Sequence, residues 1–475
     1  MVFKRVLHAP IFSCLILFFS SAWAESSSIE LLVAKTTQLE KEIKALKEEM
    51  ATLQSSQTSE SPAPKTMLST MTSVVGLPVI NSVYLNKQPE FDGSDLIVNM
   101  SENGLYLNLM EQRATIAPLN SDNHYPIVML SGEVQPVMVY QQSSQSSTAR
   151  MAIYSAIFDI STIINPWVES FFSFMSGASS YSSLANADDL SMPSNLSITV
   201  DNAFINIGNL NKTPFYLVAG QAYLPFGQYN TNMVTWSMLS AMAQTRQPTV
   251  IAGYSQGVQN GFSGALFAYN SEVTQGNNGA GGGNLTYQWG NDAISGNLSG
   301  SVISNIGDSG GMQNTGASDG TFPGFGENAN TEAFNPVPGY DFNGTLNIGS
   351  YSFLAEYASA AVPFSSSALS YNGEGAKPSS GNIEAAQTFK WLHKPATVAI
   401  GYGWTSQALA LDLAQQRFSA VLNVSWWRDT VESLEFRHDI NYSSSDYASG
   451  LGAEISNTGA NTSTNTLTGS IALYF

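Results

Sequence analysis

The feature that most constrains this chain is a regular alternation of short and long interruptions between strand-like segments, beginning at Ile127. Short interruptions such as "NPW", "GND" and "RD" alternate with long ones, the first at 141–149 and the longest at 307–338. A membrane β-barrel has short turns at one end and longer loops at the other, whereas a β-sandwich has no reason to alternate them. The predicted strands are 127–140, 150–163, 167–175, 195–209, 214–224, 249–256, 261–270, 283–289, 293–306, 339–348, 351–360, 383–392, 396–405, 416–427, 430–442 and 466–475.

Several of these segments have a two-residue period with one apolar face. In 430–442, Leu434 and Phe436 alternate with Glu435, Arg437 and Asp439. An arginine that faces lipid at the bilayer midplane costs ~2–4 kcal/mol, so the charged face is expected to line a polar lumen. The predicted fold class is therefore all-β, a transmembrane antiparallel outer-membrane β-barrel of about 16 strands. Fourteen strands is the alternative if 249–256 and 283–289 are too short for the ~9–11 residues of a spanning strand.

The residues before the barrel predict three further segments. Lys4 and Arg5 precede an apolar stretch that ends in "AWA" (22–24), which predicts a signal peptide over 1–24. Apolar residues at heptad spacing between Ile29 and Leu53 predict a coiled-coil helix over 25–54. A single helix folded onto its own domain is the alternative. A linker and periplasmic segment (55–126) then leads to the barrel domain (127–475).

The C-terminal heptapeptide "GSIALYF" alternates apolar and mixed residues up to Phe475. It is expected to form the last strand and to pair with the first, because an open sheet edge is costly in lipid. We expect Phe475 to act as an assembly signal for the barrel assembly machinery. An even number of strands puts both termini in the periplasm, with the chain in the cell outer membrane.

The charge balance and motif content narrow the function. The chain has 18 Lys and Arg against 36 Asp and Glu, for a net charge of −18, which argues against nucleic acid as a partner. It has no HExxH or CxxC motif, and no catalytic residue, metal site or cofactor is expected. The chain is therefore predicted to be a pore rather than an enzyme.

Charged residues on the predicted lumenal faces are the candidate pore-lining and ligand-binding residues. Arg417, Arg437 and Lys390 share that face with Glu435 and Asp439. Such charges can select permeants electrostatically; a structural ion-pair ladder that keeps the lumen wet is the alternative. The long interruption 225–248, rich in Met and aromatic residues, adds Arg246 to the candidates. It is expected either to fold inward as a constriction or to remain an outer cap.

Five stretches in order resemble the LbtU family of siderophore porins, which includes the legiobactin receptor, FslE and FupA. They are "SDLIVN" (94–99), "LMEQR" (109–113), "SGEVQ" (131–135), "AGQAYLPFGQYNTNMVT" (219–235) and "QTRQP" (244–248). The resemblance implies a sixteen-stranded barrel that takes up a ferric siderophore of the polycarboxylate type, without an energy-coupled plug domain. This chain departs from the family at Trp236-Ser237-Met238 and Gln244, where relatives carry an "SDPLT"-like stretch and an acidic residue.

Three functions follow as alternatives. The first is a siderophore-preferring porin, the second a general diffusion porin for small hydrophilic solutes, and the third a structural barrel that anchors the envelope. The expected partners are a ferric siderophore or small hydrophilic solute, outer-membrane lipid and the barrel assembly machinery. A homo-oligomer formed through the coiled coil is a further expectation.

Overall fold

The structure, a computed structural model, describes most of the chain from Leu68 onward. The described residues are 68–74, 77–80, 103–116, 125–143, 146–177, 198–256, 260–271, 279–291, 293–316, 320–326, 335–427 and 429–475. The chain divides into Met1–Thr66 and Met67–Phe475. The predicted signal peptide (1–24) and coiled coil (25–54) lie outside the described residues.

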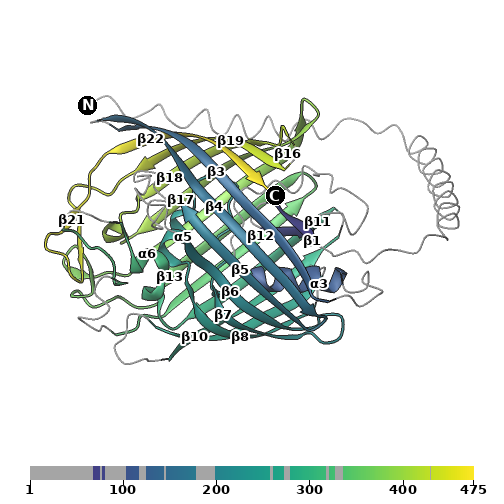
Figure 1. Cartoon of the computed structure of the whole chain (residues 1–475). Coiled ribbons are helices and arrows are strands. Elements are labelled where there is room, and N and C mark those ends of the chain that lie inside the picture. The colour runs from purple at the N-terminus through teal and green to yellow at the C-terminus, as the bar shows by residue number, and fades with distance from the viewer. Residues whose placement is uncertain are drawn as a thin grey trace, which may run out of the picture. The chain divides into compact units, whose positions relative to one another are not determined.

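Sixteen antiparallel strands form a closed barrel, since each pairs with the next and the last, β22, pairs with the first, β3 (Figure 1). The first eight are β3 (Ile127–Ser143), β4 (Ser147–Asn165), β5 (Val168–Gly177), β6 (Thr199–Gly208), β7 (Phe215–Tyr223), β8 (Arg246–Ser255), β9 (Gly261–Asn270) and β10 (Gly279–Gly290). The second eight are β11 (Ile294–Ile303), β12 (Gly339–Ile348), β13 (Tyr351–Ala360), β16 (Ser379–Trp391), β17 (Lys394–Ser406), β18 (Gln416–Val424), β19 (Thr430–Ile440) and β22 (Ser463–Tyr474).

Each of the sixteen predicted segments corresponds to one barrel strand, so the outer-membrane β-barrel prediction is confirmed. The two segments that left fourteen strands open are longer than predicted: β8 has 10 residues and β10 has 12. Strand β10 begins in the run "GAGGG", whose glycines pair regularly with β9 but carry no side chains to produce an alternating pattern.

The prediction of a long interruption at 141–149 is wrong. Strands β3 and β4 have 17 and 19 residues, and only 144–146 separate them. The polar residues at this end continue the ladder, as Gln142 pairs with Ser147. Strand β3 also contains Pro136, which has no backbone N–H to donate. The register of the β3–β4 ladder shifts between Gln135 and Pro136, and such an irregularity is where a strand accommodates proline.

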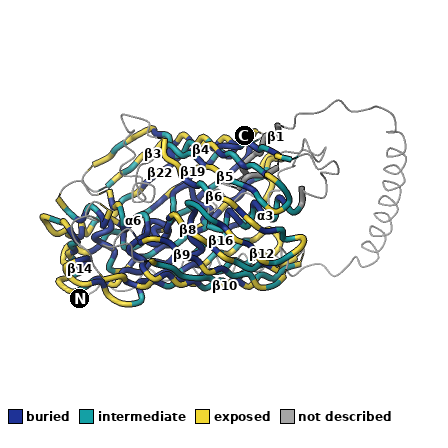
Figure 2. Tube along the Cα trace, turned by 60° about the horizontal axis from the view of Figure 1, so that its bottom comes forward, coloured by how far each residue is buried: buried dark blue, intermediate teal, exposed yellow. Residues whose placement is uncertain are grey.

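The predicted faces are observed in β19 and along most of β18, whereas Ala396 and Val424, at the ends of their strands, are buried although an outer position was predicted. Phe418 and Phe436 are 46% and 48% exposed on the outer surface, whereas Arg417 and Arg437 are 5% and 1% exposed inside. Figure 2 shows the same alternation of buried and exposed residues along the strands. An apolar outer surface on a closed barrel is the form in which strands cross a bilayer, because every backbone group is paired.

The two ends of the barrel differ. One end, here the turn end, has short connections such as Leu392–His393, both at positive φ (49° and 67°), the geometry of a two-residue hairpin. The other end, the loop end, carries a small sheet of β14 (Leu369–Tyr371), β15 (Glu374–Gly375), β20 (Tyr447–Gly450) and β21 (Asn457–Thr458). In the part of the chain that is described, no helix combines the length and apolar character needed to cross a membrane.

Segment 66–126, to which the sequence assigned no fold, contributes two strands and a helix. Strand β1 (Leu68–Val74) pairs parallel with the start of β3 and antiparallel with β2 (Leu77–Ile80). Helix α3 (Leu105–Ile116) has its Leu105, Leu109 and Met110 side chains in the buried core. The barrel therefore encloses residues that precede it in sequence.

Candidate functional site

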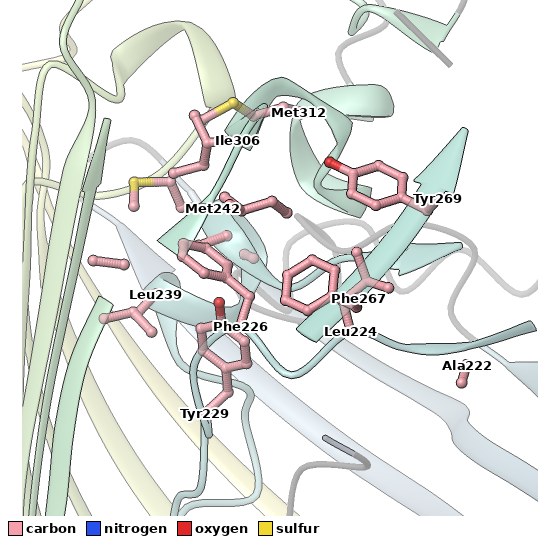
Figure 3. Packing of buried hydrophobic residues seen from close by; sticks show 14 of the residues in the cluster. Ala222, Leu224, Phe226, Tyr229, Leu239, Met242, Phe267, Tyr269, Ile306 and Met312 are labelled. Carbon is pink, nitrogen blue, oxygen red and sulfur yellow. The ribbon is translucent and has the colours of Figure 1, made fainter. Parts of the chain in front are cut away.

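The interior of the barrel is crossed by the connection between β7 and β8, residues 224–245, here called the inward loop. Its side chains are mostly buried, and it contains the short helix α5 (Met238–Ala243), which Ser237 caps. Phe226, Leu239 and Met242 of this loop belong to one apolar cluster with Phe267 of β9 and Met312, the latter in α6 (Gly310–Gln313) (Figure 3). Of the two sequence alternatives for this segment, folding inward is the one observed.

Three glutamates on the barrel wall hold the inward loop by hydrogen bonds. They are Glu356 on β13, Glu384 on β16 and Glu435 on β19, and together they are here called the carboxylate clasp. All three carboxylates are buried and accept hydrogen bonds from backbone N–H groups of the loop. Glu356 accepts from the backbone nitrogens of Gln228 and Tyr229, the latter at 2.7 Å. Backbone donors paired with a carboxylate make strong, charge-assisted bonds.

Glu384 holds the next part of the loop. Its carboxylate accepts from the backbone nitrogen of Asn232 at 2.7 Å, from the Asn232 side-chain amide at 3.0 Å and from the Thr231 hydroxyl. Asn423 of β18 donates to the backbone oxygen of Asn232 at 3.1 Å. Both sides of this stretch of backbone are thereby hydrogen-bonded to the wall.

Glu435 completes the clasp. It accepts from the backbone nitrogens of Val234 and Thr235, the latter at 3.0 Å, and from the Thr235 hydroxyl at 2.6 Å. The next residue, Trp236, donates its backbone N–H to the Tyr154 hydroxyl of β4 at 3.2 Å. The clasp thus binds the loop at steps of three residues, across three wall strands.

The other predicted lumenal charges form an ion-pair ladder beside the clasp. Arg417 makes a two-point contact with Asp439, with nitrogen–oxygen distances of 2.7 and 3.1 Å. Arg437 Nε lies 2.9 Å from Oδ2 of the same carboxylate, the oxygen that Arg417 contacts at 3.1 Å. Arg417 also donates to the backbone oxygen of Trp236 at 3.4 Å. The structure therefore brings together four of the six candidates, Glu435 included, and pairs their charges with one another or with the loop.

The remaining two candidates lie elsewhere. Arg246, at the start of β8, is paired with Asp201 of β6 and lies 5.8 Å from the centre of the Tyr223 ring. Lys390 shares the strand face of Glu384 but is exposed at the turn end, one pair before the β16–β17 hairpin. Their participation in ligand binding stays a prediction.

Helix α3 is anchored to the wall and to the inward loop. Arg113 donates to the backbone oxygen of Gly208 at 2.5 Å and lies 3.4 Å from Glu169 of β5. At the other end, the Asn103 side chain donates to the backbone oxygens of Leu224, Phe226 and Gly227 at 3.0–3.1 Å. The helix and the inward loop therefore form one connected assembly inside the barrel.

A cavity of about 220 Å³ lies between α3, the inward loop and strands β7 and β9–β11. Among the described residues, its lining contains no Asp, Glu, Lys, Arg or His. Its amides come from Asn103, Asn108, Gln228, Asn230, Asn284, Gln288 and Asn297, and its hydroxyls from Ser263, Thr286, Ser299, Ser301, Tyr106 and Tyr216. Burial raises the pKa of the Tyr106 phenol well above its ordinary value, so this group stays neutral.

The charged residues buried in the described structure carry an excess of acid. Three arginines, Arg113, Arg417 and Arg437, are buried with nine carboxylates. The nine are Asp159, Glu169, Asp201, Asp308, Asp341, Glu356, Glu384, Glu435 and Asp439. Such an interior disfavours anionic permeants on electrostatic grounds.

Sequence reasoning missed Glu356 and Glu384 as clasp residues. Each stands as a lone acid among small or apolar neighbours, in "LAEYA" and "NIEAA", at an inward-facing position. That pattern is the signal that could have found them, because a buried carboxylate requires a partner. The residues at which this chain departs from the LbtU pattern also have structural roles. Trp236 donates its backbone N–H to Tyr154, Ser237 caps α5, and the Gln244 side chain donates to the Asn103 side chain at 3.2 Å.

The GxSxG pattern of α/β-hydrolases was also overlooked. It occurs at "GYSQG" (253–257), "GDSGG" (307–311) and "GASDG" (316–320), of which the last extends outside the described residues. That motif needs a sharp turn from a strand into a helix. Ser255 instead ends β8 ahead of the next antiparallel strand, β9, and Ser309 follows a short 3-10 helix, η2 (Ile306–Asp308), rather than a strand. In the described ranges, no group of three or more His, Cys, Asp or Glu residues is placed to hold a metal ion.

Similarity to other proteins extends over most of the chain. A UPF0422 protein of Legionella pneumophila (strain Philadelphia 1) is 36% identical over 425 residues, which cover 85% of this chain and 78% of that protein. The chain belongs to the UPF0422 family. A UPF0422 protein of Coxiella burnetii is 36% identical over 373 residues, covering 76% of this chain and 75% of the relative. No family model matches the sequence.

Solved structures of outer-membrane channels are similar to this UPF0422 chain only at low sequence identity and with TM-scores below 0.5. The channel DcaP of Acinetobacter baumannii is 12% identical, with a TM-score of 0.45. The match covers 74% of this chain and 97% of DcaP. The anion-selective porin of Comamonas acidovorans is 11% identical, with a TM-score of 0.44, over 74% of this chain and 100% of the porin. Likeness at this level carries no inference about the solute.

Proposed function

We propose that this UPF0422 protein is an outer-membrane channel that admits small hydrophilic solutes through a lumen narrowed by the inward loop. The observation that supports this most is the carboxylate clasp, which fixes backbone across the interior of a closed, membrane-type barrel. An envelope anchor needs only the outer surface of a barrel. It has no use for an ordered loop in a polar interior.

Liposome swelling with the purified full-length chain tests this proposal. The expected result is swelling in small polar solutes at a rate that falls as solute size increases, because the inward loop sets the width. Empty liposomes and liposomes with the heat-unfolded chain are the controls. Absence of swelling in every solute, with a correctly folded barrel, would leave the envelope anchor as the better assignment.

Ferric siderophore uptake is a second, more specific proposal, supported by the five sequence stretches that resemble the LbtU family and by the interior arginines. A polycarboxylate ligand would bind Arg417 and Arg437 through charge-assisted hydrogen bonds. It would have to compete with Asp439, which already occupies both side chains. The acid excess of the interior also works against an anionic ligand.

Uptake of radiolabelled iron, supplied as a ferric polycarboxylate siderophore to iron-starved cells, tests this second proposal. Loss of uptake on deletion of the gene, restored by the wild-type chain but not by Arg417→Ala with Arg437→Ala, would support it. Lys212→Ala, at an exposed position in the short connection between β6 and β7, is the matched control. Unchanged uptake in the deletion strain would exclude the ferric siderophore proposal and leave the general channel.

A further inference from the structure

The uncharged cavity is a feature that neither the clasp nor the ion-pair ladder explains. We propose that it is a binding subsite for an electrically neutral, polyhydroxylated solute of the size of one sugar or sugar alcohol. This inference rests on the proposed channel function and names the class of solute that the channel would prefer. The following observations carry it.

The first observation is the contrast between the cavity and its surroundings. The buried interior is rich in carboxylates, yet the polar side chains of the described lining are amides, hydroxyls and two phenols, beside Leu107, Pro225 and three glycines. A charged solute that entered would lose hydration without meeting an opposite charge, which is unfavourable. A neutral polyol would exchange its water hydrogen bonds for protein ones at little net cost.

The second observation is the chemistry of the lining groups. Side-chain amides and hydroxyls can each donate and accept hydrogen bonds, as sugar hydroxyls do. Tyr106 and Tyr216, with ring centres 5.9 Å apart, add two phenol groups to the lining. The Oδ1 atom of Asn297 is buried at this lining without a hydrogen-bond partner in the protein. A solute hydroxyl is a suitable donor for it.

The third observation is the size and position of the cavity. Its volume of about 220 Å³ is several times the ~30 Å³ that one water takes up in the liquid. Pro225, Gln228 and Asn230 of the inward loop form one side, and the wall strands form another. A bound solute would therefore touch the element that narrows the lumen, which is where selection is effective.

The test is block of ion current through the full-length chain in planar bilayers by three probes with one carbon skeleton: sorbitol, protonated glucamine and gluconate. These are neutral, cationic and anionic. We expect sorbitol to half-block the current at a concentration about tenfold below that of either ion, a difference of about 1.4 kcal/mol. Strongest block by glucamine would mean that the acid excess governs selection, and equal block by all three would mean no subsite. Either result would overturn the inference.

Two cavity variants, Ser299→Phe and Asn297→Asp, and one control, Ser295→Phe, locate the effect. Ser299→Phe fills the cavity from β11 and should abolish sorbitol block, while Ser295→Phe, on the same face about 13 Å nearer the turn end, should retain it. Asn297→Asp is nearly isosteric and should shift the preference towards glucamine. Retained sorbitol block in Ser299→Phe, or an unchanged preference among the three probes in Asn297→Asp, would contradict the site. Absence of any conductance would instead contradict the channel function itself, so the two failures are distinguishable.

Discussion

Removal of the Glu435 carboxylate should release one third of the clasp and widen the channel. Glu435 makes three hydrogen bonds to the inward loop, through Val234 N, Thr235 N and the Thr235 hydroxyl. Hydrogen bonds to a charged group contribute ~1.5–3 kcal/mol each, so Glu435→Ala should cost the attachment of this stretch about 5 kcal/mol. An equilibrium shift of that size is roughly three to four powers of ten.

Glu435→Gln is the matched control, because the geometry lets an amide replace the carboxylate. The amide oxygen can accept from the two backbone N–H groups that now share one carboxylate oxygen, and the amide nitrogen can donate to the Thr235 hydroxyl. Only the charge is lost, at about 1 kcal/mol for each of the three hydrogen bonds, so roughly 2 of the about 5 kcal/mol of attachment remain. Adjacent loop backbone remains held by Glu384 in both variants.

Single-channel recording in planar bilayers separates the two variants. Glu435→Ala should raise the unit conductance and add flicker as residues 233–236 leave the wall, while Glu435→Gln should resemble the wild type. Heat-modifiable mobility on gels verifies that both barrels are folded. Equal conductance and noise in all three folded proteins would refute the reasoning that the clasp sets the width of the lumen.

Three further predictions concern α3, the ion-pair ladder and the closing strand. Arg113→Met should weaken the attachment of α3 to the wall by about 3 kcal/mol and raise the protease sensitivity of α3 without unfolding the barrel. Unchanged protection of α3 would contradict the anchoring role of Arg113. Arg417→Met should destabilise the barrel by about 3 kcal/mol in thermal gel-shift assays, because Asp439 loses its two-point partner, while Lys390→Met should have no effect. Deletion of Phe475, whose backbone pairs with β3, should lower the amount of folded barrel in the outer membrane, and normal assembly would exclude it as a signal.

The barrel could be predicted from the sequence because its physical basis is local. A period of two assigns every side chain of a strand to lipid or lumen, so the inward position of Arg417 and Arg437 followed directly. The pairing of Arg417 with Asp439 also depends on register, which neighbouring strands of similar length restrict. Weak alternation in the glycine-rich start of β10 marks the limit of this reasoning.

The contents of the lumen could not be predicted because their contacts are distant in sequence. Glu356 binds backbone N–H groups about 127 residues earlier in the chain, and backbone donors leave no mark on side-chain patterns. Helix α3 packs on the wall through some faces and lines a polar cavity through another, so its apolar residues show no helical stripe. The cavity itself is formed by three separate parts of the chain.

The measurement that tests the central claim most directly is the conductance of the purified full-length chain in a planar lipid bilayer. The account predicts discrete, uniform current steps, smaller than those of Glu435→Ala, from a barrel whose lumen is narrowed but continuous. A folded, inserted barrel that passes no measurable current in either form would contradict the assignment of this UPF0422 protein as a channel.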